Sequence, residues 1–161
     1  SDYVEAADAR RLPKEVKRVI DLAYSKGHVS KDDIYLSDSL KTANARLAAD
    51  EAELPAFERD ARAPAAALRT VMAAGDTFLS YSQYAKAEEF YTKALAMPGV
   101  DSGAALTRLG IAQAEQGKHG EALATFAKIT GKRAPIAQMW TGYVKQKQMA
   151  ATPTVASAAT T

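Results

Sequence analysis

The chain has 161 residues, which suits a single domain with a continuous core, and its 47% hydrophobic and 25% charged residues are ordinary values for a soluble globular protein. It contains no cysteine, which excludes disulfides, thiolate metal sites and cysteine nucleophiles. The formal net charge is +2 with both signs interspersed, so the sequence predicts neither nucleic acid nor an anionic membrane as a partner, and no apolar stretch is long enough to span a membrane.

Residues 1–29 are predicted to form a degenerate, truncated helical hairpin. The segment 14–26 has the spacing of an amphipathic helix that ends at Gly27, with four apolar residues on one face: Val16, Val19, Ile20 and Ala23. Residues 2–10 then supply the tail of a preceding helix. Because the chain starts at Ser1 without a methionine, we expect that a preceding part of the protein has been removed.

Residues 30–63 are predicted to be a long helical insert. Ser30 can cap its first helix, with Asp33 in the position of the capping box where a glutamate is usual. Apolar residues then recur at steps close to a heptad: Leu36, Leu40, Ala43, Leu47, Leu54 and Phe57. Pro55 is expected to interrupt this pattern, which divides the segment into two helices, 31–53 and 55–62.

The segment 64–147 repeats itself with an offset of 35 residues. In the first copy the matching positions are Val71, Ala74, Gly75, Phe78, Ala87, Tyr91 and Ala94. In the second copy they are Leu106, Leu109, Gly110, Gln113, Ala122, Phe126 and Ile129. The start of the pattern returns a third time at Trp140, Tyr143 and Val144. Small residues let paired helices approach closely, and large ones fill the space toward the next pair.

This pattern resembles the tetratricopeptide repeat, with its tryptophan, leucine and glycine in a first helix, its alanine and phenylalanine in a second, and a closing proline. Residues 68–147 are similar to two such repeats followed by the first helix of a third. The resemblance implies an all-α fold, a right-handed superhelix of helical hairpins with a capping helix at its end. It is closest in kind to the C-terminal repeat region of longer, exported bacterial proteins of this family.

Helix-terminating residues agree with the repeat. Asp101 and Ser102 offer an N-cap before a helix over 103–116, and Gly117 suits its C-terminal end. Gly131 follows a predicted helix over 119–129, and Pro135 suits the first turn of the last helix. The final residues, 148–161, carry no charge or apolar period after Met149 and are predicted to be a disordered tail.

No catalytic motif is present, so the sequence predicts a protein that is not an enzyme and that needs neither a cofactor nor a metal. The two histidines, His28 and His119, lie far apart in the sequence beside predicted turns. The adjacent carboxylates point in different directions on a helix and make poor acid–base dyads: Asp32 with Asp33, Asp50 with Glu51, and Glu88 with Glu89.

The resemblance also implies a binding surface, because the first helix of each tetratricopeptide repeat lines a concave groove. In the first repeat the matching positions are Arg69, Met72, Asp76 and Leu79. In the second they are Ala104, Thr107, Ile111 and Ala114, and in the last helix Gln138, Thr141 and Lys145. This mildly apolar set suits an extended or helical segment of another protein.

The function expected from the sequence is therefore that of a scaffold that binds another protein or a peptide. Two alternatives remain open. The chain could be a structural module that assembles with itself into a homo-oligomer, since residues 36–57 and the truncated hairpin offer apolar surface. It could also be an accessory domain of a larger envelope protein. The resemblance favours a periplasmic or secreted location, with a cytoplasmic one as the alternative.

Overall fold

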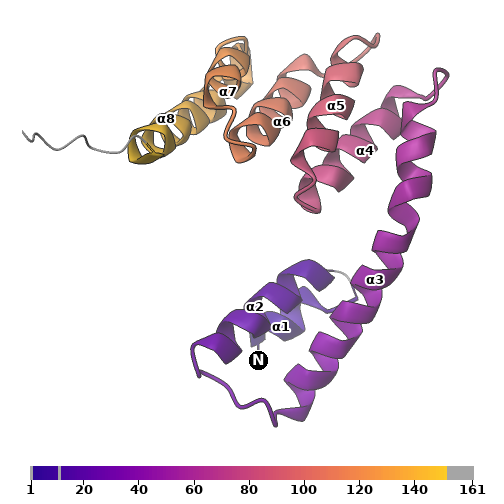
Figure 1. Ribbon diagram of the computed structural model, residues 1–161, viewed down its shortest axis with the longest axis vertical. Coiled ribbons are helices and arrows are strands. Elements are labelled where there is room, and N and C mark those ends of the chain that lie inside the picture. The colour runs from indigo at the N-terminus through magenta and orange to yellow at the C-terminus, as the bar shows by residue number, and fades with distance from the viewer. Residues whose placement is uncertain (1, 11, 152–161) are drawn as a thin grey trace, which may run out of the picture. The chain divides into compact units, whose positions relative to one another are not determined.

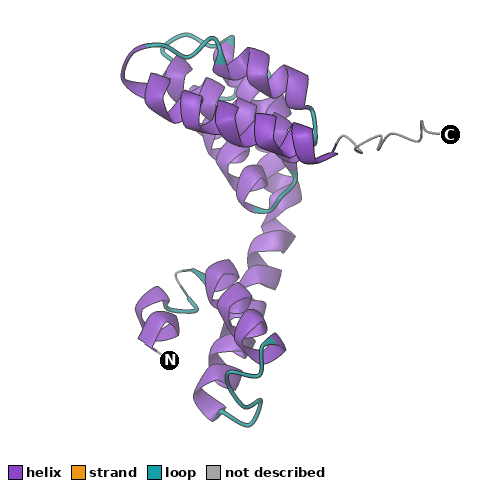
Figure 2. Ribbon diagram, turned by 90° about the vertical axis from the view of Figure 1, so that its left-hand side faces the viewer, coloured by secondary structure: helices purple, strands orange, loops and turns teal. Residues whose placement is uncertain are grey.

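In the computed structural model, which describes residues 2–10 and 12–151, every regular element is a helix (Figures 1 and 2). The all-α prediction is therefore confirmed for this part of the chain. The helices group into two compact units, one of residues Ser1–Phe57 and one of Glu58–Thr161. We call them unit 1 and unit 2 and describe each by itself.

Unit 1 contains helices α1 (Asp2–Ala7) and α2 (Pro13–Ser25) and the first part of α3 (Ile34–Arg62). Its core is formed by seven buried side chains: Val4, Ala7, Ala9, Val16, Ile20, Leu36 and Ala43. Val19 packs against this cluster as well. The apolar face predicted for the segment 14–26 therefore does point into a core, which α3 helps to complete.

Helix α3 differs from the prediction at both of its expected boundaries. It begins at Ile34, because the Asp33 carboxylate accepts a hydrogen bond from the Leu36 amide at 3.0 Å and so caps the helix in place of Ser30. It is also one helix with Pro55 inside it, where the sequence predicted two. A proline within a helix costs about 3 kcal/mol through one lost hydrogen bond and a steric clash.

The last turns of α3 have tertiary contacts in unit 2 that offset this cost. Glu58 accepts a hydrogen bond from Lys86 at 2.6 Å, and Arg62 donates two to Glu89 at 2.8 and 2.7 Å. Lys93 donates to the carbonyl oxygens of Ala61 and Ala63 at the helix end, where a cation also interacts well with the helix dipole. The prediction of two helices rested on Pro55 alone and could not include such tertiary contacts.

Unit 2 continues with five further α-helices, which follow one another in chain order in Figure 1. They are α4 (Leu68–Ser80), α5 (Tyr84–Leu95), α6 (Ser102–Glu115), α7 (His119–Phe126) and α8 (Ala134–Ala151), with a 3₁₀ turn η1 (Gly131–Arg133) before the last. From α4 to α7, each helix packs against the next one in the chain, and α6 also touches α4 and α8. The packing is that of helical hairpins in series.

The predicted helix ends in unit 2 are largely confirmed. Asp101 is the N-cap of α6, and its carboxylate accepts a hydrogen bond from the Ala104 amide at 2.9 Å. Gly117 follows α6 with φ of +77°, a left-handed conformation that glycine adopts without strain. Helix α7 stops at Phe126, earlier than the predicted residue 129.

The repeat has a direct counterpart in the packing of glycines against aromatic rings. A Cβ atom added to Gly75 in α4 would lie 2.6 Å from the Tyr91 ring in α5. A Cβ atom added to Gly110 in α6 would lie 2.5 Å from the Phe126 ring in α7. The same contact thus recurs 35 residues later, in step with the predicted period. Each ring lies against the glycine of its own helix pair, whereas the sequence predicted that the large residues fill the space toward the next pair. Trp140 of α8 stacks on Phe126 with ring centroids 6.3 Å apart, so aromatic packing connects α7 to the last helix.

Gln113 breaks the apolar pattern of the repeat, since it stands where the first copy has Phe78. It is buried, and its two polar atoms are both paired: Oε1 accepts from the Thr125 hydroxyl at 2.7 Å, and Nε2 donates to Glu88 at 3.1 Å. Glu88 also accepts hydrogen bonds from Gln116 and Lys118, each at 2.7 Å. A polar network therefore ties α5, α6 and α7 together at this point.

Acidification is expected to destabilise unit 2 through Glu88. Burial by itself raises the pKa of Glu88, but hydrogen bonds from Lys118, Gln116 and Gln113 outweigh burial and hold that pKa below its usual 4.5. A carboxyl with a lowered folded-state pKa stabilises the fold above its unfolded pKa, and this contribution is lost as the pH falls through the folded value. Urea midpoints measured between about pH 7 and about pH 3 should therefore fall at the acid end of this range.

Glu88→Gln should lower the urea midpoint at neutral pH and flatten its dependence on pH. An identical pH slope in Glu88→Gln and the wild type would show that the network does not depend on the Glu88 charge.

Helix α8 runs to Ala151, so residues 148–151 of the predicted tail are helical. Residues 152–161, which make up the rest of that predicted tail, lie outside the described part of the chain.

Candidate partner-binding surface

The groove residues predicted on α4 are accessible at the surface of unit 2. Arg69 and Asp76 are exposed, and Met72 and Leu79 are half-buried. Asp76 is also part of the packing: its carboxylate accepts a hydrogen bond from the Tyr91 hydroxyl at 2.7 Å and pairs with Arg108 at 3.3 Å. Burial and this hydrogen bond raise the pKa of Tyr91 far above its usual value. Asp76 thus joins α4 to both α5 and α6.

The groove residues predicted on α6 are mostly not at the surface, which corrects that part of the prediction. Thr107 is 9% exposed and donates its hydroxyl to the Gly103 carbonyl oxygen at 2.7 Å. Ala104 and Ala114 are also buried, and the half-buried Ile111 packs against the core cluster of α7 and α8. The reason is the position of α6, which has helices on more than two sides.

The groove residues predicted on α8 meet at one pocket. Gln138, Thr141 and Lys145 line a cavity of about 420 Å³ that lies between α7 and α8. The remaining lining is apolar and comes from both helices and the turn between them: Leu123, Phe126, Ala127, Ile129, Ala134 and Ala137. An apolar floor with a few polar groups at its margin is the usual make-up of a binding pocket.

The contribution of α7 to this pocket was not predicted. The groove was placed only on the first helix of each repeat, whereas Leu123 and Ala127 belong to α7 and its C-terminal end. The sequence did indicate this face. Leu123 and Ala127 are four residues apart, so they lie on one face of the helix, next to the predicted core residues Ala122 and Phe126. The α4 residues do not line this pocket.

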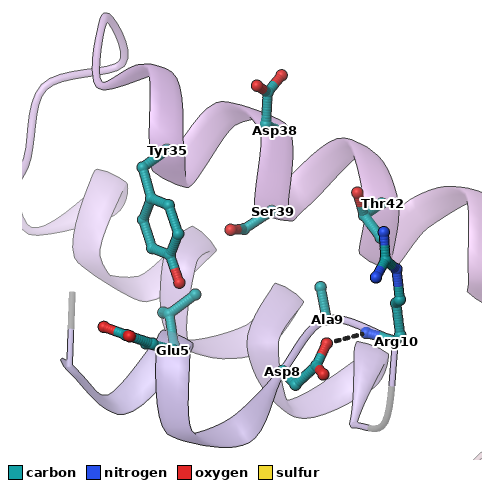
Figure 3. Close-up of a pocket in the computed structure, with 9 residues that line it drawn as sticks. Glu5, Asp8, Ala9, Arg10, Tyr35, Asp38, Ser39 and Thr42 are labelled. Carbon is teal, nitrogen blue, oxygen red and sulfur yellow. Dashed lines mark hydrogen bonds between the residues drawn. The ribbon is translucent and has the colours of Figure 1, made fainter.

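A second pocket lies in unit 1, where the sequence predicted no site. It has a volume of about 320 Å³ and lies between α1, the turn that follows it, and α3 (Figure 3). Four charged side chains line it, with three acidic groups against one basic group: Glu5, Asp8, Asp38 and Arg10. Tyr35, Ser39 and Thr42 face it from α3, and Val4 and Ala9 supply apolar surface. The turn is fixed by Asp8, whose carboxylate accepts a hydrogen bond from the Arg10 amide at 2.9 Å.

The polar residues considered for chemistry belong to different elements or bind different partners. His28 is exposed in the turn after α2, and His119 is the first residue of α7. Glu88 and Glu89 contact different helices: Glu88 accepts a hydrogen bond from Gln113 of α6, and Glu89 pairs with Arg62 of α3. Across residues 2–10 and 12–151, no group of three histidine or carboxylate side chains is placed to hold a metal ion. No helix in that same part of the chain is long and apolar enough to cross a membrane.

No protein-family model, no curated protein and no solved structure matches this chain. The tetratricopeptide resemblance therefore remains a prediction from the repeat pattern of residues 68–147.

Proposed function

We propose that the chain is a protein-binding scaffold of the tetratricopeptide type, which holds a peptide or a helix of another protein. The observation that carries the proposal is the pocket between α7 and α8, where Gln138, Thr141 and Lys145 stand at the edge of an apolar floor. All three were placed in a binding groove from the repeat frame alone. The accessible α4 residues Met72 and Leu79 supply further apolar contacts on the same unit.

The pocket suits one apolar anchor side chain with a polar or acidic neighbour. Leu123, Phe126 and Ile129 provide the apolar contact for the anchor. The exposed Lys145 at the margin favours a carboxylate on the bound segment. The ligand class supported best is therefore a short, mildly acidic peptide or amphipathic helix with an exposed apolar residue.

Filling the pocket tests this function. A photo-crosslinking residue at position 141 first identifies the bound segment, and the affinity of that segment is then measured by calorimetry. Thr141→Trp places an indole in the cavity and should weaken binding by tenfold or more, because about 1.4 kcal/mol of lost contact is already tenfold. Thr92→Trp, at an exposed residue of α5, is the control and should leave the affinity unchanged.

Equal affinities for the wild type and Thr141→Trp would show that the pocket is not the binding site. Circular dichroism of each variant separates lost binding from lost structure. Met72→Glu tests the α4 surface in the same way, because Met72 is half-buried at the surface, whereas a charge at Ile111 would also disturb the core.

Self-assembly is the second candidate function. It is favoured by the large apolar side chains that are exposed in unit 1 and on α8.

A further inference from the structure

Among the described residues, large exposed apolar side chains occur in two segments of the sequence. In unit 1 they are Tyr3, Leu12, Leu22, Ile34 and Tyr35, and on α8 they are Ile136, Met139, Tyr143 and Met149. Between residues 36 and 135 none is found, and from α4 to α7 the helices cover one another in series. Exposed apolar surface gathered at particular elements marks a site of interaction.

The exposed residues of α8 form a stripe along one face. Ile136, Met139 and Tyr143 are three and four residues apart and are 43%, 66% and 39% exposed. The buried residues Ala137 and Val144 lie on a different face of the helix. The Tyr143 ring stacks edge-on against Trp140 at 5.4 Å and carries the Lys147 ammonium 5.0 Å from its centroid. We call Ile136, Met139, Tyr143 and Lys147 the α8 stripe.

The α8 stripe belongs to a basic part of the chain. After Glu121 the sequence contains no aspartate or glutamate at all, and its charged residues are five bases: Lys128, Lys132, Arg133, Lys145 and Lys147. Of these, Arg133 pairs with Asp101 and Lys145 borders the pocket between α7 and α8, so the positive charge on the stripe itself is that of Lys147, on which Glu115 also acts. Apolar side chains beside a cation favour an acidic partner.

The pocket in unit 1 has the complementary character. Three carboxylates line it against one guanidinium, and Val4 and Ala9 form apolar surface inside it. Tyr35, which is 47% exposed, stands at its edge on α3 (Figure 3). The exposed Ile34 is its neighbour in the sequence. We call this the α1–α3 pocket.

From this complementarity we propose that the chain associates with a second copy of itself head to tail, with the α8 stripe of one copy seated on the α1–α3 pocket of another. The apolar side chains of the stripe cover the apolar surface at the pocket, and Lys147 meets the carboxylates around it. Different surfaces meet in such a contact, so each copy keeps one free stripe and one free pocket, and association leads to chains of copies unless a ring closes.

This association is weak and sensitive to salt. The stripe runs from Ile136 to Lys147 of α8, so it is about 17 Å long, and one helix face of that length buries less than a standard stable interface. Its charge contribution weakens at high ionic strength, where the Debye length falls from about 10 Å at 0.1 M salt to about 3 Å at 1 M. An interface of apolar contacts alone would not weaken in this way.

Sedimentation velocity over a range of protein concentrations measures the association. The wild type should form dimers and longer species as its concentration rises, and less so at high salt. Met139→Glu in the stripe and Tyr35→Lys at the pocket should each weaken association by about tenfold or more, because each places like charges together. Thr92→Glu, which adds the same charge at an exposed residue of α5, should have no effect. A wild type that stays monomeric at millimolar concentration would overturn the proposal.

Cysteine crosslinking identifies the surfaces, and the absence of native cysteines makes it specific. Met139→Cys and Tyr35→Cys proteins with different tags are mixed and treated with a short bismaleimide. The mixed pair should crosslink much more efficiently than Met139→Cys with Thr92→Cys. Homodimers of Met139→Cys at a higher yield than the mixed pair would show a symmetric contact between α8 helices and so refute head-to-tail assembly. Thr141→Trp, which fills the other pocket, should leave crosslinking unchanged.

Discussion

Gly110→Val is expected to destabilise unit 2 by about 3 kcal/mol, toward the upper end of the cost of overpacking a core. Even the first added carbon would lie 2.5 Å from Cε1 and 2.7 Å from Cζ of the Phe126 ring. That ring is only 2% exposed and stacks on Trp140, so it has no open space into which to move. The free energy of unfolding, measured in urea by circular dichroism, checks the expected loss.

Gly142→Ala is the matched control for this change. Gly142 also lies within a helix, but a Cβ atom there would meet nothing within 4 Å. Alanine should therefore raise stability by about 0.5–1 kcal/mol through helix propensity alone. If Gly110→Val were as stable as Gly142→Ala, close approach of α6 and α7 at this glycine would not be needed for the fold.

Phe126→Ala is expected to cost about 3–5 kcal/mol, the usual range for a fully buried phenylalanine. The ring lies against Gly110 of α6 and against Trp140 of α8, so its loss opens a cavity that touches three helices. Chemical denaturation followed by circular dichroism measures this loss. Phe126→Leu keeps most of the volume and should cost clearly less.

The two changes can be combined to test whether they act at the same contact. Gly110→Val places methyl groups where Phe126→Ala leaves a cavity, so the double variant should be more stable than the sum of the two losses indicates. Additive losses would mean that the glycine and the ring do not share this space.

Much of unit 2 could be predicted because its signals are local or strictly periodic. The Asp101 cap depends on residues within one turn, and the glycine–ring contacts depend on a fixed spacing between paired helices. The resemblance placed Gln138, Thr141 and Lys145 on a groove-lining face of the last helix. They line one pocket with residues of α7, and their role in binding stays a prediction.

The errors arose where long-range contacts override a local rule. Pro55 does not end α3, because Glu58 and Arg62 after it are held by α5 across some 30 residues of sequence. Thr107 is not at the surface, since burial of α6 is set by neighbours on several sides and not by its own spacing. The α1–α3 pocket was missed because its members come from segments with no shared sequence pattern.

The glycine–ring contacts also bear on how the length of this protein could change. Each hairpin of unit 2 meets mainly the helices directly before and after it, and the glycine–ring contact lies inside each of the two hairpins α4–α5 and α6–α7. In such a stack, stability is close to a sum over neighbouring pairs. A duplication or deletion in the gene that adds or removes one hairpin as a unit therefore leaves the glycine–ring contacts of the other hairpins intact, so that gain and loss of whole hairpins is an open evolutionary route for this fold.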